Sequence, residues 1–189
     1  LLASRLETKR EAAVIVLFHI TGTGMEIFKT ATGSWVYPGP ALLHIAGVPL
    51  FTGFMYASVG SYIARAWRLF EFRFTRHPPW WLTALLALAI YLNFFLDHFG
   101  HDYRIAIFVA VACVFGPAWV HYRVRSRYRR MPLLLGFGLV AMFIWFAENL
   151  GTFTKAWYYP AQRHVWHAVP PSKIDSWLLL MIISSVMVS

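Results

Sequence analysis

The stretch that decides the fold class is residues 132–150, which read PLLLGFGLVAMFIWFAENL. It carries one charged side chain, Glu148, and is close to the about 20 residues that an α-helix needs to cross a bilayer. Five comparable apolar stretches occupy residues 12–31, 43–66, 80–97, 103–122 and 174–189. The sequence therefore predicts an all-α protein, a polytopic transmembrane bundle with six helices in a single domain over residues 1–189.

The composition supports a membrane protein. The 189 residues are 59% hydrophobic and 13% charged, and the mean hydropathy is +0.55. A soluble chain of this size exposes too much of its surface to hide that many apolar side chains. We therefore exclude a soluble enzyme, a disordered chain and a nucleic-acid-binding domain, and the one cysteine, Cys113, excludes an intramolecular disulfide.

The basic residues predict the orientation of the chain. Of the 17 Lys and Arg residues, 12 fall on the side of the N-terminal end: Arg5, Lys9, Arg10, Arg65, Arg68, Arg73, Arg76, Arg123, Arg125, Arg127, Arg129 and Arg130. This side is expected to be cytoplasmic. The net charge of +9 then comes mostly from basic residues that set the orientation of the chain and face anionic lipid headgroups. No nucleic-acid partner is expected. The missing initiator Met and the short last stretch lead us to expect truncation at both ends.

Two segments on the opposite, outer side resemble each other. Aligned without gaps, residues 26–38 and 148–160 share six identities: Glu26/Glu148, Thr30/Thr152, Thr32/Thr154, Trp35/Trp157, Tyr37/Tyr159 and Pro38/Pro160. Each segment leaves a helix that runs outward and leads into one that runs inward. The pattern predicts a parallel internal repeat that relates the first two helices to the last two, as found in some transporters.

Glu26 and Glu148 are the candidate catalytic residues. A carboxylate within an apolar membrane helix is costly, so each is expected to be protonated, paired or beside a polar cavity. As a pair they fit acid and base roles or the binding of a cation, whereas Lys29 and Lys155 offer a purely structural pairing. The supporting residues of this site are taken to be Lys29, Ser34, Trp35, Tyr37, Asn149, Lys155, Trp157 and Tyr159.

A second candidate site lies in the histidine-rich turn between the third and fourth helices. If the helix continues through the turn, His98 and His101 share a face and can reach one divalent metal ion. The proposed ligand set is Asp97, His98, His101, Asp102, His164 and His167. The alternative is a polar turn whose aspartates pair with Arg104, Arg163 or Lys173.

Four strings of residues resemble one bacterial integral membrane family. They are Gly33-Ser34-Trp35-Val36-Tyr37-Pro38 after Glu26, Gly47-Val48-Pro49-Leu50-Phe51, Asn93-Phe94-Phe95 with His98 and Asp102, and Ala147-Glu148-Asn149 through Trp157 to Pro160. The family is a domain of unknown function, DUF817, and the resemblance covers almost the whole chain. It implies a multi-pass protein of the bacterial inner membrane without an established activity. A weaker similarity, confined to the first helix hairpin, links the chain to membrane carotenoid hydratases and implies that an outer glutamate protonates a polyene.

Three functions remain open at this point. The first is a membrane-embedded enzyme that acts on a lipid or isoprenoid near the periplasmic leaflet by acid/base or metal-assisted chemistry. The second is a cation transporter or an accessory protein of a pump. The third is a structural subunit of a membrane complex or homo-oligomer, in which small residues such as Gly53 and Gly60 allow close helix contacts.

Overall fold

The computed structural model describes residues 8–38 and 43–189, so Arg5 lies outside the described residues. The chain divides into two compact units. The first comprises Leu1–Ala64 and Ile144–Pro171, and the second comprises Arg65–Phe143 and Ser172–Ser189. The two long helices α2 (Phe51–Leu69) and α5 (Leu133–Phe153) each contribute residues to both units.

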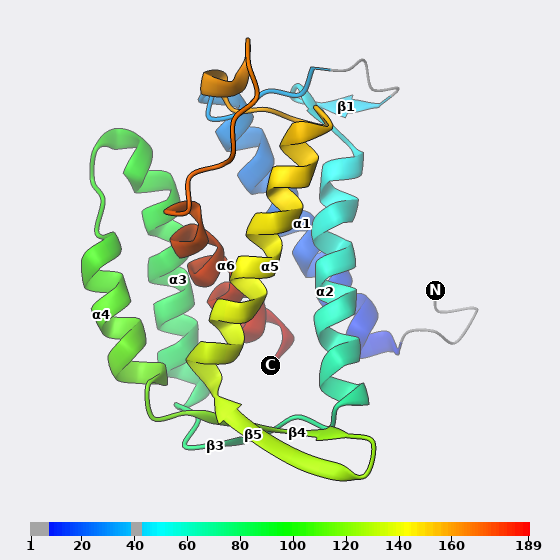
Figure 1. Ribbon diagram of the computed structural model, residues 1–189, viewed down its shortest axis with the longest axis vertical. Coiled ribbons are helices and arrows are strands. Elements are labelled where there is room, and N and C mark those ends of the chain that lie inside the picture. The colour runs from blue at the N-terminus through cyan, green and yellow to red at the C-terminus, as the bar shows by residue number, and fades with distance from the viewer. Residues whose placement is uncertain (1–7, 39–42) are drawn as a thin grey trace. The chain divides into compact units, whose positions relative to one another are not determined.

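The first unit is built on α1 (Lys9–Ala31) and the adjoining part of α2 (Figure 1). Helix α1 begins at a capping box, in which Thr8 and Glu11 bond each other's backbone N–H groups. The two helices approach closely because α2 presents Gly53 against His19 and Gly60 against Phe18, where a Cβ atom would collide. The small residues expected to allow close contacts on this helix therefore do so.

The second unit contains α3 (Trp80–Leu96), the 3₁₀ turn η1 (Asp97–Phe99), α4 (Arg104–Phe115) and α6 (Lys173–Val188). Helix α3 contacts both α4 and α6 (Figure 1). The core of this second unit includes Phe115 and Ile182, both fully buried. The elements β3 (Arg73–Thr75), β4 (Trp119–Val124) and β5 (Arg127–Pro132) form an antiparallel sheet with β4 in the middle.

This sheet corrects the expected helix over residues 103–122. Helix α4 ends at Phe115 because Gly116 and Pro117 follow, and proline lacks the N–H group and the steric freedom to continue a helix. The next residues alternate in character and pair as β4 with β5, from Trp119 opposite Pro132 to Val124 opposite Arg127. The interpretation of 103–122 as one apolar run overlooked the change from helical to strand periodicity.

The expected helix over residues 43–66 also begins later than predicted. Residues His44–Ile45 (β1) and Val48–Pro49 (β2) form a short hairpin, and α2 starts at Phe51. The turn residues Ala46 and Gly47 both have positive φ angles, as a type I′ hairpin turn requires. The other four helices begin and end within about three residues of the expected positions, a margin usual for helix boundaries.

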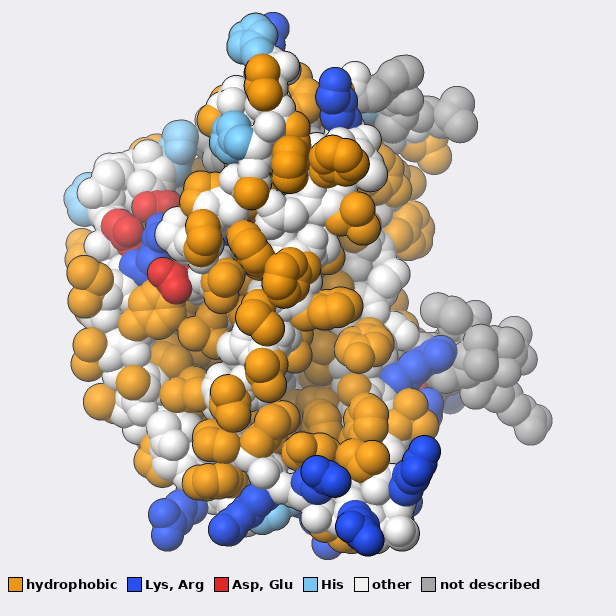
Figure 2. Space-filling view, in the orientation of Figure 1, with side chains coloured by type: hydrophobic (Ala, Val, Ile, Leu, Met, Phe, Trp, Pro, Cys, Tyr) orange, Lys and Arg blue, Asp and Glu red, His pale blue; other side chains and the backbone are white. Residues whose placement is uncertain are grey.

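Among the described residues, three helical segments are long and apolar enough to cross a membrane, namely Lys9–Ala31, Trp80–Phe99 and Leu133–Phe153. Apolar side chains are exposed on the helices: Phe143 of α5 is 74% exposed, and Ile105 of the shorter helix α4 is 83% exposed. Figure 2 shows hydrophobic side chains covering the helices and basic side chains gathered at the end that carries β4 and β5. Exposed apolar surface of this extent is expected of a protein that lies in lipid.

Candidate functional site

Glu26 lies in the last turns of α1 with 4% of its surface exposed, and it accepts three hydrogen bonds. Trp35 Nε1 and Tyr37 Oη donate to Oε2 at 2.8 and 2.6 Å, and Tyr56 Oη donates to Oε1 at 2.9 Å. Three such donors offset much of the cost of burying a carboxylate. A carboxylate has about four acceptor positions, so the donors from the described residues leave one position, on Oε1, for a further donor.

The turn after α1 brings Trp35 and Tyr37 back to Glu26. The helix ends with Gly33 at a φ of +70° and with Ser34 N donating to Lys29 O at 2.8 Å, which is a Schellman motif. The chain therefore reverses at once instead of continuing outward. Residues 35–37 then run back past the end of the helix, where their donors face the carboxylate.

Glu148 near the end of α5 repeats this arrangement in part. It is 3% exposed, and Tyr159 Oη donates to its Oε1 at 2.5 Å. Here Lys155 takes the position of Gly33 with a φ of +57°, and Ala156 N donates to Gly151 O at 3.0 Å. The two turns thus share their hydrogen bonds residue by residue, whereas a repeat of whole helix pairs stays a prediction.

The two carboxylates belong to one cluster because the two returning segments pair with each other. Val36 and Tyr158 form an antiparallel bridge with N···O distances of 3.0 and 3.1 Å. The rings of Trp35 and Tyr159 meet edge to face with centroids 6.4 Å apart. The aromatic donors of Glu26 therefore adjoin the donor of Glu148.

The phenols of this cluster stay protonated over the physiological range. Burial and the neighbouring Glu26 carboxylate raise the pKa of Tyr37 far above its ordinary value of 10.0. Burial, the charge of Glu148 and the hydrogen bond to it raise the pKa of Tyr159 in the same direction. Both hydroxyl groups thus act as fixed hydrogen-bond donors.

The other residues predicted to support the Glu26 and Glu148 site differ in burial and in what they contact. Lys29 is buried, whereas Lys155 is exposed in the turn. The Ser34 hydroxyl lies 3.2 Å from that of Thr32, within the turn itself. Trp157, the counterpart of Trp35, lies against Gly151 instead of bonding a carboxylate.

Asn149 has a structural role in the loop that follows α5. Its side chain donates to Trp145 O and accepts from Val169 N, both at 2.9 Å. Trp145 Nε1 also donates to Val169 O at 3.0 Å, and Val169 is fully buried. This pair of side chains therefore fixes the end of the loop onto α5.

Tyr56 is the member of the cluster that the sequence reasoning missed. It lies on the face of α2 that carries Gly53 and Gly60, three and four residues away, and packs against Gly22 of α1. That glycine stripe was recognised as a contact face. A tyrosine within it was the available signal for a polar group aimed at the neighbouring helix.

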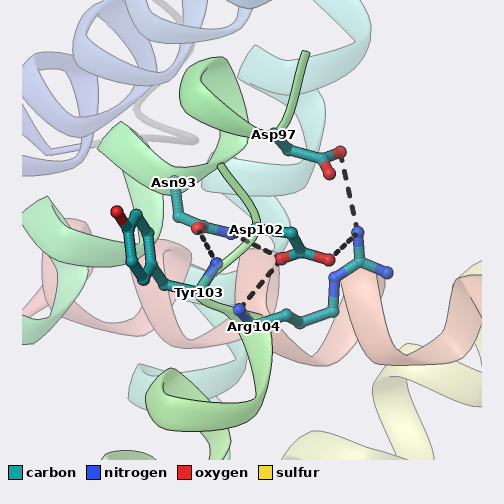
Figure 3. Close-up of polar contacts among 5 residues, drawn as sticks. All are labelled: Asn93, Asp97, Asp102, Tyr103 and Arg104. Atoms are coloured by element: carbon teal, nitrogen blue, oxygen red, sulfur yellow. Dashed lines mark hydrogen bonds and ion pairs between the residues drawn. The ribbon is translucent and has the colours of Figure 1, made fainter. Parts of the chain in front are cut away.

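The histidine-rich turn differs from the expected metal geometry. Helix α3 gives way to η1, and Gly100 at a φ of +81° turns the chain between His98 and His101. The condition for a shared face, an α-helix that continues through the turn, is therefore not met, and a metal site here stays a prediction. The aspartates instead engage Arg104, whose Nη2 lies 3.6 Å from Asp97 and 3.5 Å from Asp102 (Figure 3).

Asn93 completes this polar turn. It is 6% exposed, and its Oδ1 accepts from Tyr103 N at 2.8 Å while its Nδ2 faces Asp102 at 3.5 Å (Figure 3). Within residues 8–38 and 43–189, no group of three or more His, Cys, Asp or Glu side chains is arranged to hold a metal ion. Of the ion pairs expected as the alternative to a metal site, those of Asp97 and Asp102 with Arg104 are observed.

The fold has solved structural counterparts. The chain matches a mycobacterial Insig homologue, MvINS from Mycobacterium vanbaalenii, with a TM-score of 0.66 and 14% sequence identity over 97% of this chain and 94% of that one. A cross-linked trimer of an MvINS variant matches with a TM-score of 0.64, the same identity and the same coverage. At this identity the likeness concerns the fold, which is that of a helical membrane protein.

The sequence comparisons identify the family. The chain is 47% identical over 186 residues to the uncharacterized protein YoaT of Bacillus subtilis (strain 168), covering 98% of this chain and 70% of that protein. The likeness to carotenoid hydratases is not shown by the comparisons. Residues 1–185 match the profile of a protein family of unknown function. The chain therefore belongs to the DUF817 family of membrane proteins.

Proposed function

We propose that this protein binds a hydroxyl-bearing lipid, of the isoprenoid class or similar, beside the Glu26 and Glu148 cluster and acts on it by proton transfer. The observation that carries the proposal is the burial of two carboxylates in one cluster of phenol and indole donors. Ionisable groups within membrane helices are candidates for function by default. The lipid is proposed because the surrounding helices expose apolar surface.

The acceptor position left on Glu26 Oε1 suggests how the lipid is held. A ligand hydroxyl can donate to this oxygen, and Glu26 can then take its proton as a general base. Tyr37 and Tyr159 remain protonated, and each keeps its one O–H on its own carboxylate, Tyr37 on Glu26 and Tyr159 on Glu148, so that both carboxylates are held in place. Glu148 is the proposed acid, which gives the lipid one proton for the one that Glu26 takes from the hydroxyl, so that the net reaction is an isomerisation.

The test begins with lipid that co-purifies in a mild detergent, followed by mass spectrometry. We expect wild type to retain one lipid class and to convert it in proteoliposomes, and Glu26→Gln and Glu148→Gln to lose the conversion. Glu71→Gln, which alters a carboxylate paired with Arg123 in the other unit, is the matched control. Equal conversion by all four proteins would contradict the enzyme proposal.

Folding and chemistry must be separated in this experiment. Tyr56→Phe removes a donor and leaves the Glu26 carboxylate in place, so it should lower the conversion rate without abolishing it. If the proteins bind the lipid and none of them converts it, the proton-transfer step is refuted and the protein is a lipid-binding protein. Metal-assisted chemistry at His98, His101, His164 and His167 remains a proposal, and metal analysis of the purified protein tests it.

We propose placement in the bacterial inner membrane with the N-terminal end of the chain in the cytoplasm. The Arg-rich hairpin of β4 and β5 supports this orientation, since positive residues collect on the cytoplasmic side. Reporter fusions after α1 and after α2 should give periplasmic and cytoplasmic signals respectively. The reverse pattern would refute the orientation.

A homo-oligomer is proposed as the assembly. The support is the solved trimer of the MvINS variant, whose fold this chain shares. Light scattering in detergent should give a protein mass of about three chains. A monomeric mass at all detergent concentrations would refute it.

A further inference from the structure

The sheet in the second unit has two faces of different character, which the strand register defines. On one face Phe74, Val120 and Met131 pair across the three strands. Val120 is 3% exposed, Phe74 lies against Trp67 of α2, and Met131 lies against Gly136 of α5. This face is therefore turned toward the ends of the helices.

The same face continues outward along the hairpin with four further residues. Tyr122 pairs with Arg129 and Val124 pairs with Arg127, and alternate residues of a strand share a face. Both arginines and Val124 are exposed. Beyond the packed core, this face thus offers two cations together with an aromatic and an aliphatic side chain.

The depth of the sheet follows from its connections. Strand β5 ends at Pro132 and α5 begins at Leu133, while α4 ends at Phe115 shortly before β4 begins at Trp119. The apolar segments Trp80–Phe99 and Leu133–Phe153 start at this level. The strands therefore lie where the hydrocarbon ends and lipid phosphates begin.

The cations on the two faces differ in their partners. On the opposite face Arg123 pairs with Glu71, and Arg73 and Arg130 stack on Tyr128 and Trp119 at 5.7 and 5.2 Å. In the part of the chain that the structure describes, Arg127 and Arg129 have no acidic partner. Two unpaired guanidinium groups at phosphate depth, about 7 Å apart along one strand, are complementary to an anionic surface.

We propose that Arg127 and Arg129 bind the headgroup phosphate of anionic phospholipids, with Tyr122 and Val124 reaching into the interface beside it. Arg is suited to phosphate because its planar N–H donors bind two oxygens at once. Aromatic and aliphatic side chains next to cations are typical of surfaces that lie at the membrane interface. This site is separate from the Glu26 and Glu148 cluster and does not depend on its function.

The test is native mass spectrometry of the full chain in mild detergent, titrated with phosphatidylglycerol or with phosphatidylcholine of the same acyl chains. The paired variant Arg127→Gln, Arg129→Gln should bind phosphatidylglycerol about 25-fold more weakly, since each arginine near an anionic surface contributes roughly fivefold. The control Arg163→Gln removes an exposed charge that is not among the twelve on the predicted cytoplasmic side, and it should bind as wild type does. Phosphatidylcholine should bind weakly to all three.

Two further arms keep the result decisive. The pair Arg127→Lys, Arg129→Lys should retain most of the affinity, and 1 M salt should abolish the lipid preference of wild type, because the Debye length falls to about 3 Å. Unchanged affinity in the glutamine pair, an equal loss in the control, or equal binding of both lipids would overturn the proposal. So would displacement of the lipid by millimolar inorganic phosphate, which would indicate a site for free phosphate.

Discussion

Gly22 of α1 provides the sharpest test of how the Glu26 site is held. A Cβ atom at this position would meet Cβ, Cγ and Cδ2 of Tyr56. These atoms lie at the base of the side chain, so Tyr56 cannot swing away while α2 stays in place. Gly22→Ala must therefore displace the residue whose hydroxyl donates to Glu26 at 2.9 Å.

The expected cost follows from three terms. Overpacking a close helix contact costs about 1–3 kcal/mol, and losing a hydrogen bond to a buried carboxylate costs about 1.5–3 kcal/mol. Alanine is favoured over glycine within a helix by about 1 kcal/mol, which offsets part of this loss. Gly22→Ala should thus lower the free energy of unfolding by about 1.5–5 kcal/mol.

The assay is unfolding in mixed micelles of mild detergent and sodium dodecyl sulfate, followed by tryptophan fluorescence. Gly138→Ala in α5 is the matched control, since no atom lies within 4 Å of the added Cβ atom, and it should raise stability by up to about 1 kcal/mol. Tyr56→Phe should cost less in the Gly22→Ala background than in wild type, because the alanine has already broken the bond. If Gly22→Ala unfolds within about 0.5 kcal/mol of Gly138→Ala, the close-packing argument is refuted.

Three further predictions concern other parts of the molecule. Lys155→Gly should raise the free energy of unfolding by about 1 kcal/mol, because glycine adopts the positive φ angle at this position without strain. Gly33→Ala should lower it by about as much for the opposite reason, and the same micelle titration measures both. Effects of the same sign in the two variants would contradict this. Between pH 10 and 12 tyrosines ionise in the unfolded chain, whereas Tyr37 and Tyr159 stay protonated in the folded protein because their pKa is raised, so the free energy of unfolding should fall as pH rises. Tyr37→Phe and Tyr159→Phe should each reduce the steepness of this fall by up to about 1.4 kcal/mol per pH unit. An unchanged slope in either variant would argue against burial of that phenol. Asn93→Ala should cost about 1–3 kcal/mol because Tyr103 N loses its acceptor, and a loss below about 0.5 kcal/mol would show that water replaces it.

The helical architecture was predictable because each apolar run is long and interrupted by few charges. The prediction failed where a run hid a change of structure, as at Gly116 and Pro117, since hydropathy registers apolar side chains and does not register backbone breaks. The Ala46 and Gly47 hairpin was missed for the same reason. Both errors place strands where helix ends were expected.

The site was predictable in its acids and not in their partners. Glu26 and Glu148 stood out as rare charges in apolar helices, and the repeated Trp and Tyr residues followed each by a fixed distance. The predicted lysine partners were chosen by charge, whereas Glu26 bonds to Trp35, Tyr37 and Tyr56. Tyr56 comes from another helix, and contacts between helices are not encoded by spacing along one of them.

The two glutamate turns are alike in backbone and unlike in side chains, and this difference bears on their roles. At position 29 the first turn has a buried lysine, and Trp35 donates to Glu26. At the matching position the second turn has Gly151, and Trp157 packs against it. The indole of Trp35 thus donates to a carboxylate, whereas that of Trp157 makes a packing contact. The different donors around Glu26 and Glu148 support the proposal that one acts as acid and the other as base. Gly151→Ala, which expels Trp157, should therefore alter the conversion of lipid more than the matched Gly138→Ala does, and equal effects would contradict a division of roles.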